Sequence, residues 1–279
     1  MATARSALVT GASSGIGRAV AEELHRRGFS VVAAARRLDS LDGLACAARV
    51  ELDVTSDSSV RDAVAAAGPI EILVNNAGIG AGGPAEHVPL EETVRQMDTN
   101  FFGVVRLTRA VLPQMRRRGS GTIVNISSMS AKIPWLFAGS YAASKAAVDS
   151  YSEALRFEVA TFGIGVLLVA PGKVATDFGA RFQIHGAQDD GYEPLSAAWG
   201  RQFTLPAPGP GLVADAVANA LCDPDPPSRI VLGEDAAELL ALRSRLADRE
   251  FDQRFADYFG LEASGTDPSV PQTEGGETR

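Results

Sequence analysis

The amino-acid sequence predicts an α/β protein with a doubly wound parallel sheet that carries helices on both faces. Short β-branched segments alternate with longer helical stretches, which is typical of repeated βαβ units. A glycine-rich turn joins the first predicted strand to the first helix, as in nucleotide-binding sheets. The length of 279 residues and the 46% hydrophobic content suit one large domain with a sizeable core.

The expected strands are apolar segments of four to six residues, bounded by turns or helices. We place them at 7–10, 29–34, 50–54, 70–75, 122–126, 166–170 and 229–232. Long helices are expected at 16–27, 90–118 and 140–162, and Gly28 and Gly119 provide stop signals for the first two.

Two stretches depart from this alternation. Residues 173–210 hold glycine, proline and isolated aromatics without clear periodicity, which predicts a mobile substrate lid rather than scaffold. Residues 260–279 are rich in Gly, Pro, Thr, Ser and Glu, a composition typical of a disordered tail. We therefore expect a single domain over 1–259, followed by that tail.

Composition excludes several classes of function. The net charge of −8 disfavours a nucleic-acid partner, which requires a basic face. The three histidines are far apart and lack metal-ligand spacing, so we expect no metal site. No apolar run is long enough to span a membrane, the N-terminus lacks a signal-peptide pattern, and two cysteines make no disulfide framework. These features predict a cytoplasmic protein.

The segment Thr10-Gly11-Ala12-Ser13-Ser14-Gly15-Ile16-Gly17 follows the first strand and opens a helix. Glycines allow a tight turn and a close approach to a pyrophosphate, and the helix N-terminus offers free N–H groups to it. The same segment also spells Gly-x-Ser-x-Gly, the nucleophile elbow of α/β-hydrolases, with Ser13 as the nucleophile. The elbow normally follows a central strand, so an esterase is the alternative hypothesis rather than the preferred one.

The end of the second strand indicates which nucleotide binds. An acidic residue there hydrogen-bonds the ribose of NAD, whereas arginine accommodates the 2′-phosphate of NADP. The expected acidic position holds Ala35, and Arg36 and Arg37 follow it. Two guanidinium groups without a carboxylate favour NADP(H) over NAD(H).

Three side chains could form a catalytic group. Tyr141 and Lys145 are spaced i, i+4 on one face of a helix, so a lysine ammonium could lower the pKa of the phenol. Ser128 ends the fifth predicted strand, where its hydroxyl could reach the same reacting oxygen. Ser127 is its neighbour and the alternative choice, but the spacing to Tyr141 favours Ser128.

Together these motifs resemble the short-chain dehydrogenase/reductase superfamily. The features that carry the resemblance occur in family order over roughly 6–232: the glycine-rich turn, Asn75-Asn76-Ala77-Gly78, Ser128, Tyr141-Ala142-Ala143-Ser144-Lys145, and Pro171-Gly172 followed by Thr176. The resemblance implies a single Rossmann-type domain that transfers a hydride between a nicotinamide and a carbonyl or alcohol. It also implies a homodimer or homotetramer, whose long helices pair across a two-fold axis.

The resemblance further implies a role for each matched residue. Tyr141 would be the general acid or base, Ser128 would hydrogen-bond the substrate oxygen, Lys145 would hold the nicotinamide ribose, and Asn100 would support a proton relay to the lysine. The implied cofactor contacts are Gly11, Ser13, Ser14, Gly15, Ile16 and Gly17, Arg36 and Arg37, Asp53 and Val54, Asn76, Ala77 and Gly78, Tyr141 and Lys145, and Pro171, Gly172, Val174 and Thr176.

The substrate is less well defined by the sequence. Aromatic and apolar residues at 135–137 and at Phe178, Phe182, Tyr192, Trp199 and Phe203 could wall a pocket for an apolar ketone or alcohol. Lys173 stands where the family more often has an apolar or small residue. It could contact cofactor phosphates or an anionic substrate, but we expect it to face water. A catalytically silent NADP-binding sensor on the same fold is a further alternative.

Overall fold

A computed structural model describes residues 4–186 and 191–261. Within them, seven parallel strands form one sheet in the order β3-β2-β1-β4-β6-β7-β9, so the predicted fold class is confirmed. The strands are β1 (Ser6–Thr10), β2 (Ser30–Ala35), β3 (Ala48–Glu51), β4 (Ile72–Asn75), β6 (Gly121–Ile126), β7 (Ile164–Pro171) and β9 (Arg229–Leu232). Two further short strands, β5 (Ala81–Gly82) and β8 (Gln183–Ile184), pair with each other.

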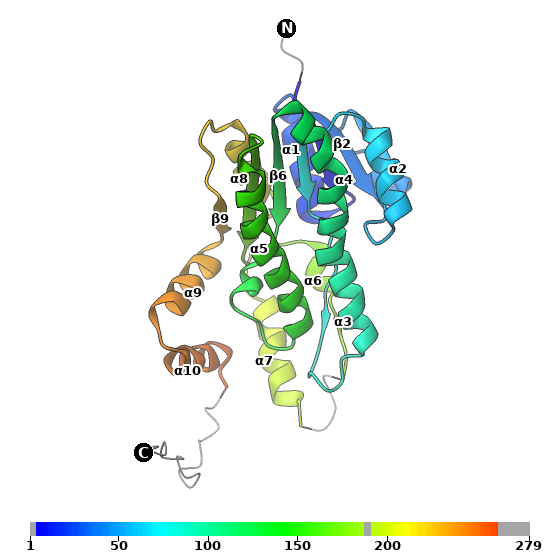
Figure 1. The fold of residues 1–279 in the computed structure, drawn as a ribbon. Coiled ribbons are helices and arrows are strands. Elements are labelled where there is room, and N and C mark those ends of the chain that lie inside the picture. The colour runs from blue at the N-terminus through cyan, green and yellow to red at the C-terminus, as the bar shows by residue number, and fades with distance from the viewer. Residues whose placement is uncertain (1–3, 187–190, 262–279) are drawn as a thin grey trace, which may run out of the picture.

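Helices cover both faces of the sheet (Figure 1). They are α1 (Gly15–Arg26), α2 (Asp57–Ala67), α3 (Leu90–Met97), α4 (Gly103–Arg118), α5 (Gly139–Ala160), α6 (Asp177–Arg181), α7 (Glu193–Phe203), α8 (Gly211–Cys222), α9 (Glu234–Arg245) and α10 (Asp248–Phe259). Short turns are η1 (Leu38–Leu41), η2 (Asp98–Phe102) and η3 (Met129–Ala131).

The two faces of the sheet follow from the alternation of side chains along each strand. In the inner strand β1, Val9 packs in one core cluster with Val20 of α1 and Val217 of α8. Leu8 points the other way and packs with residues of α2, α4 and α5, such as Leu107. Both faces are therefore buried, as the continuous apolar run of a parallel strand predicts.

The carboxyl ends of the strands point toward α6, α7, α9 and α10, which lie beyond that edge of the sheet (Figure 1). A separate apolar cluster supports α9 and α10, and it includes Met129, Ile133, Leu239 and Phe251. Ligands of doubly wound sheets bind at this edge, so these four helices are in position to form the substrate side of a site.

The structure differs from the sequence prediction in two segments. The described part of 173–210 is not irregular: it contains α6, β8 and α7. The helix predicted over 90–118 is divided into α3 and α4 by η2, one turn of π-helix. Periodicity did not reveal that turn because it adds a residue without ending the helix. Most of the predicted tail, 262–279, lies outside the described residues.

Within 4–186 and 191–261, no helix is both long and apolar enough to cross a membrane. Nor do His, Cys, Asp and Glu side chains in these ranges gather in a group that could hold a metal ion.

Candidate active site

The glycine-rich turn is shaped by its backbone. Gly11 and Gly15 have φ angles of 64° and 56°, a region that favours glycine. A Cβ at position 17 would collide with the Gly11 carbonyl and the Asn76 amide, so only glycine lets the helix come this close. Asn76 holds the turn by donating to the carbonyl of Thr10 at 3.0 Å. The Ser14 side chain leaves the N-terminus of α1 uncapped, which keeps its N–H groups available to an anion.

The two predicted phosphate-binding arginines lie at the end of β2 with exposed side chains. Arg37 makes only a long ion pair with Asp39, 3.8 Å between Nε and Oδ1. Arg36 lies close enough to Asp53 for its positive charge to favour the ionised carboxylate. Burial opposes ionisation of Asp53, but hydrogen bonds from Thr55 and the charges of Arg36 and Arg106 hold its pKa below the usual value. The expected adenine end of the site is thus an ionised, solvent-facing cluster.

Tyr141 and Lys145 lie near the start of α5, one turn apart. Phe178 and Phe182 enclose the phenol, with ring centroids 5.5 and 6.2 Å from that of Tyr141. Burial raises the pKa of Tyr141 to about 12, although a hydrogen bond with Ser128 lowers it. The phenol therefore keeps its proton at neutral pH.

Lys145 is not among the groups that shift the pKa of Tyr141 in this structure, so its expected effect on the tyrosine stays a prediction. The Lys145 ammonium donates to the carbonyl of Ile126 at 2.9 Å, and Nζ lies 5.9 Å from the centre of the Tyr141 ring. Burial lowers the pKa of Lys145 to about 8, against the charge of Asp149, which raises it. Lys145 is therefore less basic than an ordinary lysine, and it is not among the groups that lower the pKa of Tyr141.

Ser127 and Ser128 point to different partners. The Ser127 hydroxyl is buried and donates to Asp149, whose other carboxylate oxygen accepts from Arg229 at 2.9 Å. Ser128 begins η3, accepts from the amide of Ser130 at 3.1 Å, and is the serine that pairs with Tyr141.

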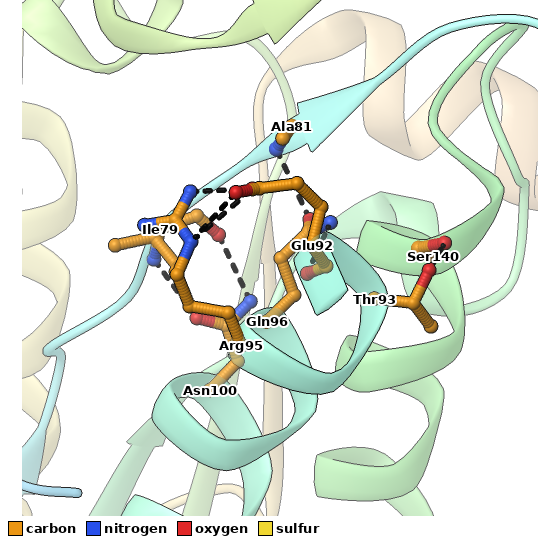
Figure 2. A network of polar contacts seen from close by, with 8 residues as sticks. All are labelled: Ile79, Ala81, Glu92, Thr93, Arg95, Gln96, Asn100 and Ser140. Atoms are coloured by element: carbon orange, nitrogen blue, oxygen red, sulfur yellow. Dashed lines mark hydrogen bonds and ion pairs between the residues drawn. The ribbon is translucent and has the colours of Figure 1, made fainter. Parts of the chain in front are cut away.

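Asn100 is buried in the π-helical turn η2, and Figure 2 shows its side-chain amide beside the backbone of Ile79. Its Oδ1 accepts from the Ile79 N–H at 2.8 Å, and its Nδ2 donates to the Ile79 carbonyl and to Ser144, each at 2.9 Å. A Cβ at Gly78 would lie 3.2 Å from Asn100 Oδ1 and 3.7 Å from Lys145 Nζ. Asn100 therefore clamps the loop after β4 in a position that borders the lysine.

A cavity of about 660 Å³ opens at the carboxyl edge of the sheet. The sequence-predicted residues that line it are Ile16, Asn76, Gly78, Ser128, Tyr141, Lys145, Pro171, Gly172, Val174 and Thr176. Those that do not line it are Gly11, Ser13, Ser14, Gly15, Gly17, Arg36, Arg37, Asp53, Val54, Ala77 and Asn100. The second set belongs to the turn, the adenine end and the supporting network.

Only some of the residues on the substrate side of the cavity could be predicted from the sequence. Trp135, Phe178, Phe182 and Trp199 line the cavity as expected, and Phe259 of α10 joins them. Tyr192 instead hydrogen-bonds Glu86 at 2.7 Å outside the cavity. The side chain of Phe203 is outside the described residues. Neither Phe259 nor Gln202, which also lines the cavity, carries a local motif, since both are brought there by tertiary packing.

The expectation that Lys173 faces water is also wrong. Its side chain lines the cavity, and its ammonium donates to Gln202 Oε1 at 3.0 Å. The residue lies two positions after the end of β7 and is half-buried, with contacts to Gln202 of α7 and Tyr258 of α10.

The fold and the site together define a class, the nicotinamide-dependent oxidoreductases. Its features here are a parallel sheet, a glycine-rich turn, an arginine pair at the end of β2, and a Ser-Tyr-Lys group that lines the cavity. Comparison with known proteins specifies the family. A family model described as short chain dehydrogenase matches residues 5–185. The chain belongs to this family and is an NAD(P)-dependent oxidoreductase that acts on small molecules.

Relatives and solved structures agree. The chain is 37% identical to human retinol dehydrogenase 8, over 82% of this chain and 81% of the relative. It is 44% identical to a 3-ketodihydrosphingosine reductase of Bacteroides thetaiotaomicron, over 61% of this chain and only 64% of that reductase's length. A short chain dehydrogenase of Burkholderia cenocepacia, solved with NADP, superposes with a TM-score of 0.75 at 28% identity, covering 90% and 97% of the two chains.

Proposed function

We propose that this enzyme uses NADPH to reduce the carbonyl group of a largely apolar substrate to an alcohol. The observation that carries the proposal is the shared cavity of Ser128, Tyr141 and Lys145, walled by aromatic side chains. When bound, the cofactor supplies the hydride. Tyr141 then donates its proton to the oxygen on which negative charge develops, and Ser128 hydrogen-bonds the same oxygen.

The state of the tyrosine supports the reductive direction. A phenol with a pKa raised to about 12 is protonated throughout the physiological range, as an acid for carbonyl reduction must be. Alcohol oxidation needs the same residue as a base, and hence needs its proton removed. Lys145, placed between Tyr141 and the Ile126 carbonyl, would hold the nicotinamide ribose, and Asn100 would fix the loop beneath it.

Preference for NADP(H) over NAD(H) rests on Arg36 and Arg37. Both are exposed beyond β2, and the buried Ala35 stands where a carboxylate would meet the ribose of NAD. The NADP in the Burkholderia neighbour is in keeping with this preference. The rest of the cofactor would contact the remaining residues of the turn and a second set that borders it: Asp53, Val54, Asn76, Ala77, Gly78, Pro171, Gly172, Val174 and Thr176.

The esterase alternative has no support in the arrangement of side chains. Ser13 lies at the nucleotide turn, and none of the cavity-lining residues is a histidine or an acid. The names of the two relatives describe a keto reductase and a retinol dehydrogenase, which favours an oxidoreductase with an apolar substrate.

A screen of NADPH oxidation across ketones and aldehydes of graded size tests the function. We expect turnover to increase with the apolar surface of the substrate until the cavity is filled. Cofactor binding without turnover of any carbonyl in the series would favour the silent sensor and reject the reductase.

A homo-oligomer in the cytoplasm completes the proposal. Large apolar side chains are exposed on α3 and α5: Leu90 and Val94 of α3 are 71% and 59% exposed, and Phe157 of α5 is 78% exposed. Such exposure marks surfaces that associate. Light scattering should give a dimer or tetramer at micromolar concentration, and Phe157→Glu should reduce its size. A wild-type monomer would reject the proposal.

A further inference from the structure

Lys173 occupies an unusual place among the residues of the cavity. Its backbone N–H donates to Asp235 at the start of α9, at 2.9 Å, which fixes the residue two positions after the end of β7. Its side chain extends into the cavity, where Nζ lies 5.4 Å from the ring centre of Trp135 and 6.0 Å from that of Tyr258. An ammonium group among aromatic rings and a neutral amide is placed to bind a ligand atom.

The charge of Lys173 is not balanced inside the cavity. Among the described residues that line the cavity, Lys145 and Lys173 are charged and none is acidic. Lys145 donates to the Ile126 carbonyl and borders Tyr141, whereas the Lys173 ammonium donates to Gln202 of α7, so the two charges have different surroundings. Asp235 raises the pKa of Lys173, but burial, the larger influence, lowers it.

The hydrogen-bonding capacity of Lys173 is also incompletely used. An ammonium carries three N–H donors, and Gln202 accepts one of them. Lys173 is half-buried, and a partly desolvated cation is stabilised more by an opposite charge than by cation–π contacts. An anionic group that enters the cavity could accept hydrogen bonds from the two remaining N–H groups of Lys173 and would face its positive charge.

We propose that Lys173 determines substrate specificity by binding an anionic group, a carboxylate or a phosphate monoester, at the end of the substrate remote from its carbonyl. This proposal rests on the proposed carbonyl reduction and names the class of its substrate. The walls formed by Trp135, Trp199, Leu205 and Phe259 would hold an apolar chain between the two polar ends. The substrate is then an amphipathic keto compound, not a wholly apolar ketone.

The use of lysine in this chain agrees with a specific role. Of its 26 basic residues, three are lysine, Lys132, Lys145 and Lys173, and the other 23 are arginine. Two of these three lysines, Lys145 and Lys173, line the cavity. A compact ammonium forms hydrogen bonds in several directions within a narrow space, whereas a planar guanidinium needs more room.

Calorimetry on the NADPH-loaded enzyme tests the proposal with three ligands of equal chain length, decanoate, decyl phosphate and decan-1-ol. One anion or both should bind about ten- to a hundredfold more tightly than the alcohol, the range expected for hydrogen bonds to a charged group. Lys173→Met should remove this preference while leaving the affinity for decan-1-ol unchanged. Lys173→Arg should retain part of it, and Lys132→Met, at an exposed lysine, should change nothing.

Equal affinity of the wild-type enzyme for the anions and the alcohol would overturn the proposal, independently of how any variant folds. So would a Lys173→Met enzyme that loses affinity for all three ligands to the same extent, because that result would identify Lys173 as a brace between β7 and α7. Whether decanoate or decyl phosphate binds more tightly identifies the anion. Turnover of decan-2-one, measured separately, decides the proposed reduction without affecting the binding comparison.

Discussion

The nucleotide side and the substrate side of the cavity are built in different ways. The nucleotide side consists of consecutive strand–turn–helix units, and its shape depends on backbone geometry, such as the positive φ of Gly11 and the Asn76 clamp on the turn. The substrate side brings together side chains from α5, α6, α7 and α10, which are separated by over a hundred residues in the chain. A polar contact from Arg181 to the Ser14 hydroxyl, at 3.4 Å, links α6 to the nucleotide turn.

This contrast indicates how well each side of the cavity tolerates amino-acid substitution. Backbone interactions tolerate few substitutions, because a Cβ at Gly17 would already displace the turn. The substrate side depends on packed aromatics and one lysine, so its shape can change without loss of the sheet. Cofactor chemistry and substrate choice are therefore separable in this protein, and each prediction below acts on one side or on the boundary between them.

The largest effect is expected at the boundary, for Tyr141→Phe. Removal of the proton donor should lower kcat by about 10²- to 10⁴-fold, the usual contribution of general acid catalysis, with NADPH affinity unchanged. Stopped-flow or steady-state NADPH oxidation measures the loss, and Tyr192→Phe, outside the cavity, is the matched control. Retained reduction in Tyr141→Phe, or an esterase activity abolished by Ser13→Ala, would contradict the assignment.

On the nucleotide side, Arg36→Ala should weaken NADPH binding by about ten- to a hundredfold, the range for hydrogen bonds to a charged group. NADH affinity should stay the same, because NADH lacks the 2′-phosphate that the guanidinium would bind. Fluorescence titration with both cofactors gives the ratio. Arg61→Ala, another exposed arginine, is the control. An unchanged preference in Arg36→Ala would exclude Arg36 from the phosphate site.

The pH dependence of reduction should report the state of Lys145. Its pKa is lowered to about 8, so the ammonium is charged below that pH and neutral above it. Tyr141, with a pKa raised to about 12, stays protonated over the same range, and Asp149 is the acidic neighbour that favours the charged lysine. We therefore expect kcat/KM to fall as pH rises through about 8.

A Lys145→Arg enzyme provides the control for this profile. Arginine keeps its charge over the whole range, so the residual activity of the variant should not decline near pH 8. A decline at the same pH in both enzymes would assign it to another group.

The smallest effect is expected within the substrate side, in the dynamics of the segment over 173–210. Helix α6 has no buried residue, whereas α7 is attached through Lys173–Gln202 and through Arg201 to the Phe259 carbonyl. Hydrogen exchange should therefore slow by a few-fold in α6, and less in α7, when NADPH and decanoate bind. Protection that is high before binding and unchanged afterwards would make the segment a rigid wall and not a lid.

How much of this could be predicted from the sequence differs between the two sides. The glycine turn, Arg36 and the Tyr141–Lys145 spacing act locally, so their positions follow from short motifs. Lys173 was misplaced because its burial depends on α7 and α10, which pack from distant parts of the chain. The pKa of Tyr141 could not be foreseen either, because it depends on Phe178 and Phe182, which a motif does not place.

The π-helical turn that holds Asn100 has a consequence for the length of the chain. One residue more than a regular helix needs lies between α3 and α4, and each residue of an α-helix corresponds to about 100° of rotation. Deleting any residue from 98–102 would leave an uninterrupted helix but would rotate α3 relative to α4 by that angle. The exposed side chains of Leu90 and Val94 would then point in a different direction relative to α4, and Gln96 would lose the Ala81 N–H. A single extra residue thus sets both the direction in which α3 presents its exposed apolar side chains and the contact that Gln96 makes with β5.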